Sequence, residues 1–268
     1  MSTVKLMRRF DPNIDGRDFV VGDLHGCFSL LQILLAHVEF DESVDRLFSL
    51  GDLVDRGPES ERVSEFLVQP WFHAIRGNHD YMLLKGAHMV EQAPVDMAAT
   101  HTWLQNGGEW FLHLMPSDQD TIYFDISRLP YAMEVALPDG GIAGLIHAQP
   151  FEGSWQETRV LLDPEHWSAD TPENLERLVW DRSMARRIRF DEQDGWSYDG
   201  SPQVDTVDLV YIGHTAHDSP ISLGNTRWMD TNAGYEGGGP SLAELGINGR
   251  VWTVSGDGAH IDEGWNRP

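Results

Sequence analysis

The chain has 268 residues, 41% of them hydrophobic, so it can build a buried core and is not a disordered polymer. Its 19 basic and 43 acidic residues give a formal net charge of −24, and such a surface repels nucleic acid and anionic membranes. We therefore expect neither a nucleic-acid partner nor a membrane partner.

The cysteine content and the apolar segments indicate the compartment. Cys27 is the single cysteine, which excludes an intramolecular disulfide and is typical of a reducing environment. Residues 1–16 contain no apolar signal-peptide core, and the longest apolar stretch, residues 30–38, is too short to span a bilayer. We therefore expect a cytoplasmic protein. From its length, we also expect residues 1–268 to form a single domain.

The first 90 residues repeat one arrangement three times, in which an apolar strand leads through a polar loop into a helix. Residues 18–26 lead into a helix predicted over 27–38, whose apolar residues recur at helical spacing. Residues 45–57 lead into a helix over 58–69 that begins at Pro58, and residues 71–80 lead into a helix over 81–90. This alternation predicts parallel strands whose loops meet at one edge of a sheet, where α/β proteins bind their ligands.

The remainder of the chain is less regular. We expect helical or loop insertions at about residues 86–135 and 151–203. Residues 141–150 and 207–215 predict two further strands, the first ending at His147 and the second ending in His214. The residues from 226 onward suggest antiparallel strands, with a hairpin turn at Asn248-Gly249.

Carboxylate, imidazole and amide side chains stand at the ends of five predicted strands. Oxygen and nitrogen donors without a thiolate suit Mn²⁺, Fe²⁺ or Zn²⁺. Any one of these residues alone is more often an ordinary turn residue or a hydrogen-bonded histidine, but their recurrence at five strand ends favours a metal site. Because a carboxylate has two oxygens, Asp52 in the middle loop is a candidate bridge between two ions. The donors are Asp23, His25, Asp52, Asp55, Asn78, His79, His147 and His214.

The motifs GDLHG, GDLVDRG and GNHD occur in this order, followed by GGEWF at 107–111. Together they resemble the calcineurin-like metallophosphoesterases, and more specifically the bacterial and phage type of PPP-family serine/threonine protein phosphatase. The resemblance runs from about residue 17 to about residue 232. It implies an α/β metallophosphoesterase fold, in which central mixed β-sheets form a β-sandwich flanked by helices. The metal site would lie at the carboxyl ends of the strands.

The resemblance also implies roles for individual residues. Two divalent ions are expected, Mn²⁺ first, with Fe or Zn as alternatives. One ion would be bound by Asp23, His25 and Asp52, and the other by Asp52, Asn78, His147 and His214. His79 matches the general acid and Asp55 the carboxylate that orients it. Arg56 and Arg182 match phosphate-binding arginines, with Asn78 also touching substrate. We select Arg182 over its neighbours, which are Arg186, Arg187 and Arg189.

The implied activity is hydrolysis of phosphomonoesters, as phospho-Ser/Thr and also phospho-Tyr, by direct attack of a hydroxide held between the two ions. The partner would be a phosphoprotein or a small phosphorylated molecule. One alternative is a dinucleoside-tetraphosphate hydrolase or nucleotide phosphodiesterase, in which Asp80 is common where many protein phosphatases have glutamate. Those hydrolases often lack the acid matching Asp55, however. The other alternative is a catalytically silent binding module, against which the retained ligands and His79 argue.

Three further aromatic and two further polar positions lie outside these motifs. We consider Trp103, Trp110 and Trp155 as candidates to line a substrate groove, although tryptophan is more often a core residue. Asp230 and Asn232 fall in a loop near the expected site, and the sequence assigns them no role.

Overall fold

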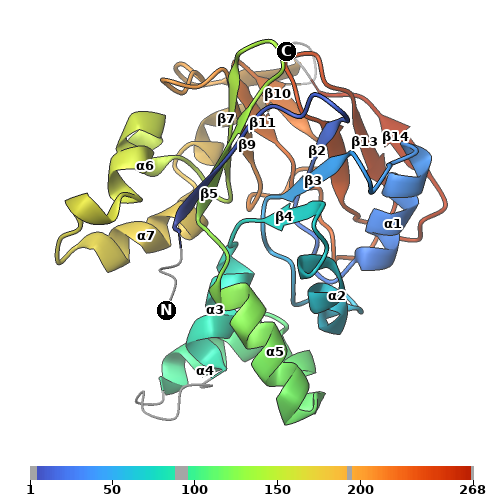
Figure 1. Ribbon diagram of the computed structural model, residues 1–268, viewed down its shortest axis with the longest axis vertical. Helices are drawn as coiled ribbons and strands as arrows, with labels where there is room; N and C mark the ends of the chain where they lie inside the picture. Colours follow the sequence, from blue (N-terminus) through green and yellow to red (C-terminus); the bar gives the residue numbers. More distant parts are fainter. Residues whose placement is uncertain (1–4, 88–95, 192–194, 267–268) are drawn as a thin grey trace.

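The computed structural model describes residues 5–87, 96–191 and 195–266, and these residues contain two six-stranded mixed sheets (Figure 1). In spatial order, the first sheet consists of β1 (Met7–Phe10), β5 (Ala132–Ala136), β6 (Ile142–Ile146), β9 (Leu209–Ile212), β11 (Thr226–Trp228) and β10 (Ile221–Leu223). The second sheet consists of β14 (Ile261–Glu263), β13 (Val251–Val254), β12 (Ser241–Glu244), β2 (Asp18–Val21), β3 (Arg46–Ser49) and β4 (Phe72–Ala74). The expectation of mixed sheets in an α/β fold is confirmed.

The two sheets pack face to face through an apolar layer. Val20 and Phe48 from the second sheet meet Leu145 and Tyr211 from the first sheet in one buried cluster. Side chains alternate between the two faces of a strand, so Phe19, a neighbour of Val20, points to the opposite face and packs under helices instead. Strands buried on both faces read as the nearly continuous apolar runs seen in the sequence.

Helices cover the outer faces of this sandwich (Figure 1). The second sheet is covered by α1 (Phe28–His37), η1 (Ser60–Arg62) and α2 (Val63–Leu67), and the first by η3 (Phe151–Gly153), α6 (Trp155–Leu161), η4 (Pro164–His166) and α7 (Thr171–Trp180). A further group lies at one end of the sandwich and contains α3 (Asn78–Gly86), α4 (Met97–Gln105), η2 (Gly108–His113) and α5 (Pro116–Ser127). After η5 (Ala185–Arg187), a separate hairpin pairs β7 (Ile188–Asp191) with β8 (Gly195–Tyr198).

Strand direction places the predicted loops together. β2, β3 and β4 run parallel in one sheet, and β6 and β9 run parallel in the other. The loops that follow β2, β3 and β4 therefore meet at one edge, as expected. The loops that follow β6 and β9 bring in His147 and His214 from the opposite layer of the sandwich.

Two predicted helix starts are wrong. The second helical segment begins at Ser60 rather than Pro58, because left-handed backbone at Asp55 and Arg56 keeps the chain in a turn up to Glu59, whose N–H donates to the Gly26 carbonyl. The third helix begins at Asn78 rather than at residue 81, because extended backbone at Gly77 starts the helix there. Residues 88–90 of that predicted helix lie outside the described residues.

The expected antiparallel pairing of the tail is confirmed for β12, β13 and β14, but one strand, the turn position and the content of the two insertions differ from prediction. Strand β11 pairs in parallel with β9, and the turn between β12 and β13 centres on Ile247 and Asn248, since the Gly249 N–H donates to the Gly246 carbonyl. The segment 86–135 ends in strand β5, and the segment 151–203 includes the β7–β8 hairpin.

Within the described ranges, no helix combines the length and apolar character needed to cross a membrane.

Candidate active site

The eight predicted donors converge at the carboxyl ends of strands from both sheets and are all buried. None of their residues is more than 4% exposed, an unusual state for so many polar side chains. They are Asp23, His25, Asp52, Asp55, Asn78, His79, His147 and His214. A buried set of this kind requires hydrogen-bond partners or a cation to compensate for lost hydration.

The backbone that carries these side chains is strained. His25, Asp52, Asp55 and His214 have φ angles of 43°, 47°, 72° and 65°, in the left-handed region that residues other than glycine rarely adopt. Such conformations cost on the order of 1–3 kcal/mol each and persist where the surrounding structure fixes them. The strain is thus concentrated in the loops that aim the donors inward.

Two glycines leave the room that the central carboxylates occupy. A Cβ at Gly77 would lie 2.2 Å from Asp52 Oδ1, and one at Gly213 would lie 2.2 Å from Asp23 Oδ1. Both distances are far below van der Waals contact. The glycines of the third motif and of the strand end before His214 are therefore needed for close approach of backbone and carboxylate.

The two histidines from the first sheet present ring nitrogens to one oxygen. His147 Nδ1 lies 2.8 Å from the Leu50 carbonyl, so Nδ1 carries the proton and Nε2 faces Asn78 Oδ1 at 2.9 Å without one. His214 Nε2 lies 3.2 Å from the Trp180 carbonyl, and its Nδ1 faces the same oxygen at 2.7 Å. Burial lowers the pKa of both rings, to about 3 for His214, which keeps them neutral. Ring nitrogens of two neutral histidines that converge on one amide oxygen fit a bound cation.

Asp52 lies at the centre of the site. Its Oδ2 is 3.5 Å from His25 Nε2, and its Oδ1 is 3.4 Å from His147 Nε2. Burial works to raise its pKa, but electrostatic interaction with His147, His79 and His25 outweighs burial and lowers it. Asp52 thus offers one oxygen to each side of the site.

Two groups of ligand atoms within 4.8 Å of one another share this residue. One group is His25, Asp52 and His79, and the other is Asp23, Asp52 and His147. Asp52 is common to both groups, as the resemblance implies for a residue shared by two ions. Burial, then the nearby Asp230 and Asp52 carboxylates, raise the pKa of Asp23 well above its usual value. A cation beside Asp23 would favour its ionised form.

His25 completes the group around the first motif. Its Nδ1 lies 3.1 Å from the Val54 carbonyl, which leaves the Nε2 lone pair directed into the site. An Arg56 Nη1 hydrogen donates to that lone pair at 2.8 Å, and the guanidinium stacks over the Tyr235 ring at 4.8 Å. Arg56 therefore already places positive charge at the donor cluster.

His79 and Asp55 form a buried pair beside the donors. His79 Nδ1 lies 2.8 Å from Asp55 Oδ2. The other ring nitrogen, Nε2, is buried and has no hydrogen-bond partner among the described residues. A nitrogen left unpaired in this way is available to exchange a proton with a bound molecule.

Arg182 and the arginines that follow it in the chain make different contacts. Arg182 is exposed and its Nη1 lies 3.4 Å from Thr215 Oγ1, next to His214. Burial is the main cause of the lowered pKa of His214, and Arg182, after His147, contributes to it through its charge. Arg189 instead donates to the carbonyls of Arg186 and Ile188. Arg182 is thus the arginine of this segment whose charge reaches the donor cluster.

The three tryptophans considered for a substrate groove have other places. Trp103 and Trp110 donate to Asp55 Oδ1, at 3.2 and 2.8 Å. Trp155 is fully buried and donates to Glu134 Oε1 at 2.8 Å. The groove interpretation is wrong for Trp103 and Trp155, both of which are 0% exposed, because each is enclosed by packing around a carboxylate.

Asp230 is a buried acid that sequence reasoning left without a role. It is 6% exposed, and its carboxylate accepts the Asn232 N–H at 3.0 Å. Burial, with a further contribution from Asp52, raises its pKa to about 6. Its position just after a buried strand is the same signal that identified the eight donors.

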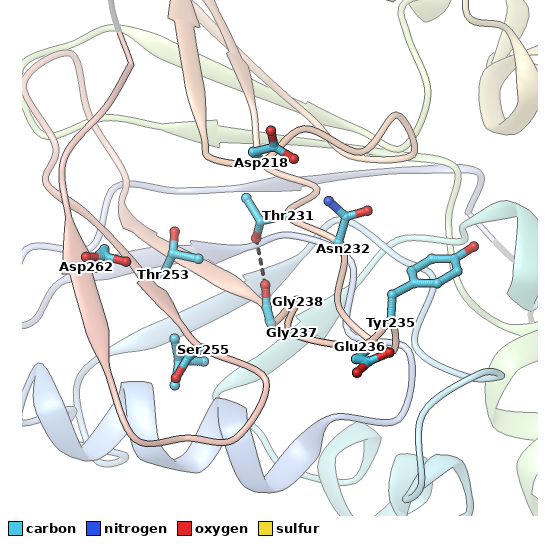
Figure 2. A pocket seen from close by; sticks show the side chains of 12 residues that line it. Asp218, Thr231, Asn232, Tyr235, Glu236, Gly237, Gly238, Thr253, Ser255 and Asp262 are labelled. Atoms are coloured by element: carbon cyan, nitrogen blue, oxygen red, sulfur yellow. Dashed lines mark hydrogen bonds between the residues drawn. The ribbon is translucent and has the colours of Figure 1, made fainter.

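A cavity of about 420 Å³ lies beside the site in the loop 231–239 (Figure 2). Its lining, drawn from the described residues, is mainly polar and includes Thr231, Asn232 and Tyr235 but none of the eight donors. Tyr235, which stacks on Arg56, connects the cavity to the site.

The fold and the donor set together fit a class of proteins that binds divalent metal ions where the loops of two sheets meet. Residues 19–218 match the family model described as calcineurin-like phosphoesterase. The chain belongs to this family.

Curated relatives extend the comparison over most of the chain. It is 38% identical over 222 residues to serine/threonine-protein phosphatase 2 of Escherichia coli, which covers 82% of this chain and 88% of that protein. It is 30% identical over 230 residues to serine/threonine-protein phosphatase 1 of Salmonella typhimurium, covering 85% and 91%. It is 26% identical to the symmetrical bis(5'-nucleosyl)-tetraphosphatase of Coxiella burnetii, covering 81% and 84%.

Asp80 ties two of the site loops together. It is fully buried, its Oδ1 accepts the Leu53 N–H at 3.1 Å, and its Oδ2 accepts the Gly77 N–H at 2.8 Å. Leu53 and Gly77 adjoin Asp52 and Asn78 in sequence. This carboxylate therefore fixes the spacing of the second and third motifs.

We predict that Asp80→Asn lowers the free energy of unfolding by about 1–3 kcal/mol, because one of the two buried N–H groups would face an amide donor. Urea unfolding of the metal-free chain measures this change. The control is Asp118→Asn, an exposed acid in the first turn of α5, which should stay within about 0.5 kcal/mol. Equal stability of both variants would remove Asp80 from the support of the loops.

Proposed function

We propose that the chain is a metal-dependent phosphoprotein phosphatase that hydrolyses phosphomonoesters of serine and threonine, with phosphotyrosine as a further substrate class. The observation that carries the proposal is the buried His79–Asp55 pair, whose free His79 Nε2 adjoins a donor cluster that fits cations. The names of the relatives that are 38% and 30% identical support the same activity.

We further propose that residues 1–268 form one domain. Trp103, Phe111 and Ile122 from the first expected insertion share a core with Phe19 of the second sheet. Leu178, in the second insertion, packs in one cluster with residues of the first sheet. Neither insertion has a core of its own among these clusters, which supports the proposal of a single domain.

Two divalent ions, which we propose to be Mn²⁺, would be held by Asp23, His25, Asp52, Asn78, His147 and His214, with Asp52 shared. When bound, such ions lower the pKa of a water ligand toward neutrality and neutralise charge on phosphoryl oxygens. Oxygen and imidazole donors suit Mn²⁺, and the donor set also accommodates Fe or Zn.

The protein's own residues would bind the phosphate and move the proton. Arg56 and Arg182 would bind phosphoryl oxygens, since the planar guanidinium matches phosphate geometry, and Asn78 would contact the substrate as well. His79 would donate its Nε2 proton to the departing alkoxide oxygen. Asp55 would keep the proton on Nδ1 and stabilise the charged ring before that transfer.

A nucleotide hydrolase is the second candidate, and two observations favour it. These are the 26% identity to a bis(5'-nucleosyl)-tetraphosphatase and the presence of Asp80 in the third motif. The retained Asp55 and its hydrogen bond to His79 favour phosphomonoester hydrolysis, because an alkoxide leaving group needs a proton more than a phosphate leaving group does.

Purified chain supplied with Mn²⁺ should be assayed on a phosphoserine peptide, 4-nitrophenyl phosphate and diadenosine tetraphosphate. The proposal expects turnover of the first two and little of the third. A clear preference for the dinucleotide would support the second candidate, and absence of any turnover would favour a binding module.

We predict that His79→Asn keeps its metal ions but loses about 10²–10⁴-fold in kcat on a phosphoserine peptide, the usual contribution of a general acid. Steady-state kinetics and metal analysis of the same sample measure both quantities. Unchanged kcat would exclude His79 as the acid.

We predict that Asp52→Asn loses bound metal, because an amide offers one neutral oxygen where a carboxylate offers two charged ones. Equilibrium dialysis against Mn²⁺ compares the variant with the unsubstituted chain. Full binding of two ions by the variant would contradict a shared role for Asp52.

We predict that Arg182→Ala lowers kcat/KM by about 10–100-fold, since a hydrogen bond to a charged group is worth about 1.5–3 kcal/mol. Arg186→Ala is the matched control in the same segment and should change kcat/KM less than about two-fold. The reverse order would transfer the phosphate-binding role to Arg186.

A further inference from the structure

The GGEWF segment carries a contact that the proposed mechanism does not use. Asp55 is fully buried and its two oxygens have different partners. Oδ2 binds His79 Nδ1 at 2.8 Å, whereas Oδ1 accepts the indole N–H of Trp110 at 2.8 Å and that of Trp103 at 3.2 Å. Both indoles come from the segment expected as an insertion, α4 and η2, and reach a loop about fifty residues earlier in the chain.

Close packing fixes this segment against the Asp55 loop. A Cβ at Gly108 would lie 2.4 Å from Trp103 Nε1, and one at Gly107, where φ is 100°, would lie 2.7 Å from the backbone nitrogen of Arg56. The Phe111 ring packs edge-on against Trp103 and Trp110, with ring centroids 5.6 and 5.5 Å away. The two glycines and the phenylalanine thus explain the motif as a support for two indole donors.

The contacts restrict what the carboxylate can do. A carboxylate rotates easily about its terminal bond, and a single hydrogen bond to His79 would leave the other oxygen buried and unsatisfied. Two N–H donors on Oδ1 satisfy that oxygen and fix the plane of the carboxylate. Oδ2 is then held on His79 Nδ1, which fixes the tautomer and aims Nε2 toward the donor cluster.

We propose that Trp103 and Trp110 are positioning residues for the general acid, acting through Asp55. The inference rests on the proposed function in that His79 is taken as the proton donor. Of the eight donors, Asp55 is the one that accepts from both indole N–H groups, so we assign their effect to proton transfer and not to phosphate binding.

The test compares substrates whose leaving groups need the proton to different degrees. With Trp110→Phe, which keeps an aromatic ring but removes the N–H, we expect kcat to fall about 10-fold on a phosphoserine peptide and on phenyl phosphate. On 4-nitrophenyl phosphate, whose leaving group departs readily without a proton, we expect a fall of less than about two-fold. KM should change little for any of the three substrates.

Trp155→Phe is the matched control, because its indole N–H also donates to a carboxylate, that of Glu134 on β5. This variant should lose stability without changing the ratio of kcat between phenyl and 4-nitrophenyl phosphate. An equal fall on all substrates for Trp110→Phe, or no fall, would overturn the proposal.

A second readout is independent of turnover. The Nδ1–H proton of His79, identified by its absence in His79→Asn, should be visible by proton NMR in the metal-free chain and should exchange faster in Trp110→Phe. If the chain hydrolyses no phosphomonoester, the proposed function fails, and this measurement alone decides whether the indoles fix the Asp55–His79 pair. Unchanged exchange would overturn the positioning role.

Discussion

The burial of eight polar side chains in one cluster is the constraint on which the rest of this structure depends. Ring nitrogens of His147 and His214 lie 2.9 and 2.7 Å from the Asn78 oxygen, and Asp52 oxygens lie 3.5 Å from His25 and 3.4 Å from His147. Such an arrangement is unfavourable in a low-dielectric interior unless a cation compensates for it. The strained backbone at His25, Asp52 and His214 and the close glycine contacts are the local features that hold it in place.

The sandwich explains how so unfavourable a cluster is held. Three loops of the second sheet and two of the first end at the same place because the strands that precede them run parallel within each sheet. The apolar layer between the sheets fixes their spacing. His25, His147 and His214 are each oriented by a backbone carbonyl, whereas His79 is oriented by the Asp55 carboxylate. The strands therefore place the loops at one position, and the strained loop backbone aims the side chains.

Features that depend on the local pattern of apolar and polar residues could be predicted from the sequence. Apolar runs followed by polar loops predicted the strands, and their alternation with helices predicted which loops meet. The sequence did not predict that Pro58 lies outside its helix. The left-handed backbone at Asp55 and Arg56 depends on contacts with the loop around Gly26, which is distant in sequence. Nor did the sequence predict that Trp103 and Trp110 bind Asp55 while Trp155 binds Glu134, since a tryptophan in a helical pattern looks the same with any buried partner. The roles of the donors remain predictions, although the structure brings all eight together.

The most direct test of this account is anomalous diffraction from a crystal of the chain grown with Mn²⁺. The account predicts two anomalous peaks between the sheets, both in contact with Asp52 oxygens, with nitrogens of His147 and His214 on one of them. A single peak, or two peaks of which neither touches Asp52, would contradict it.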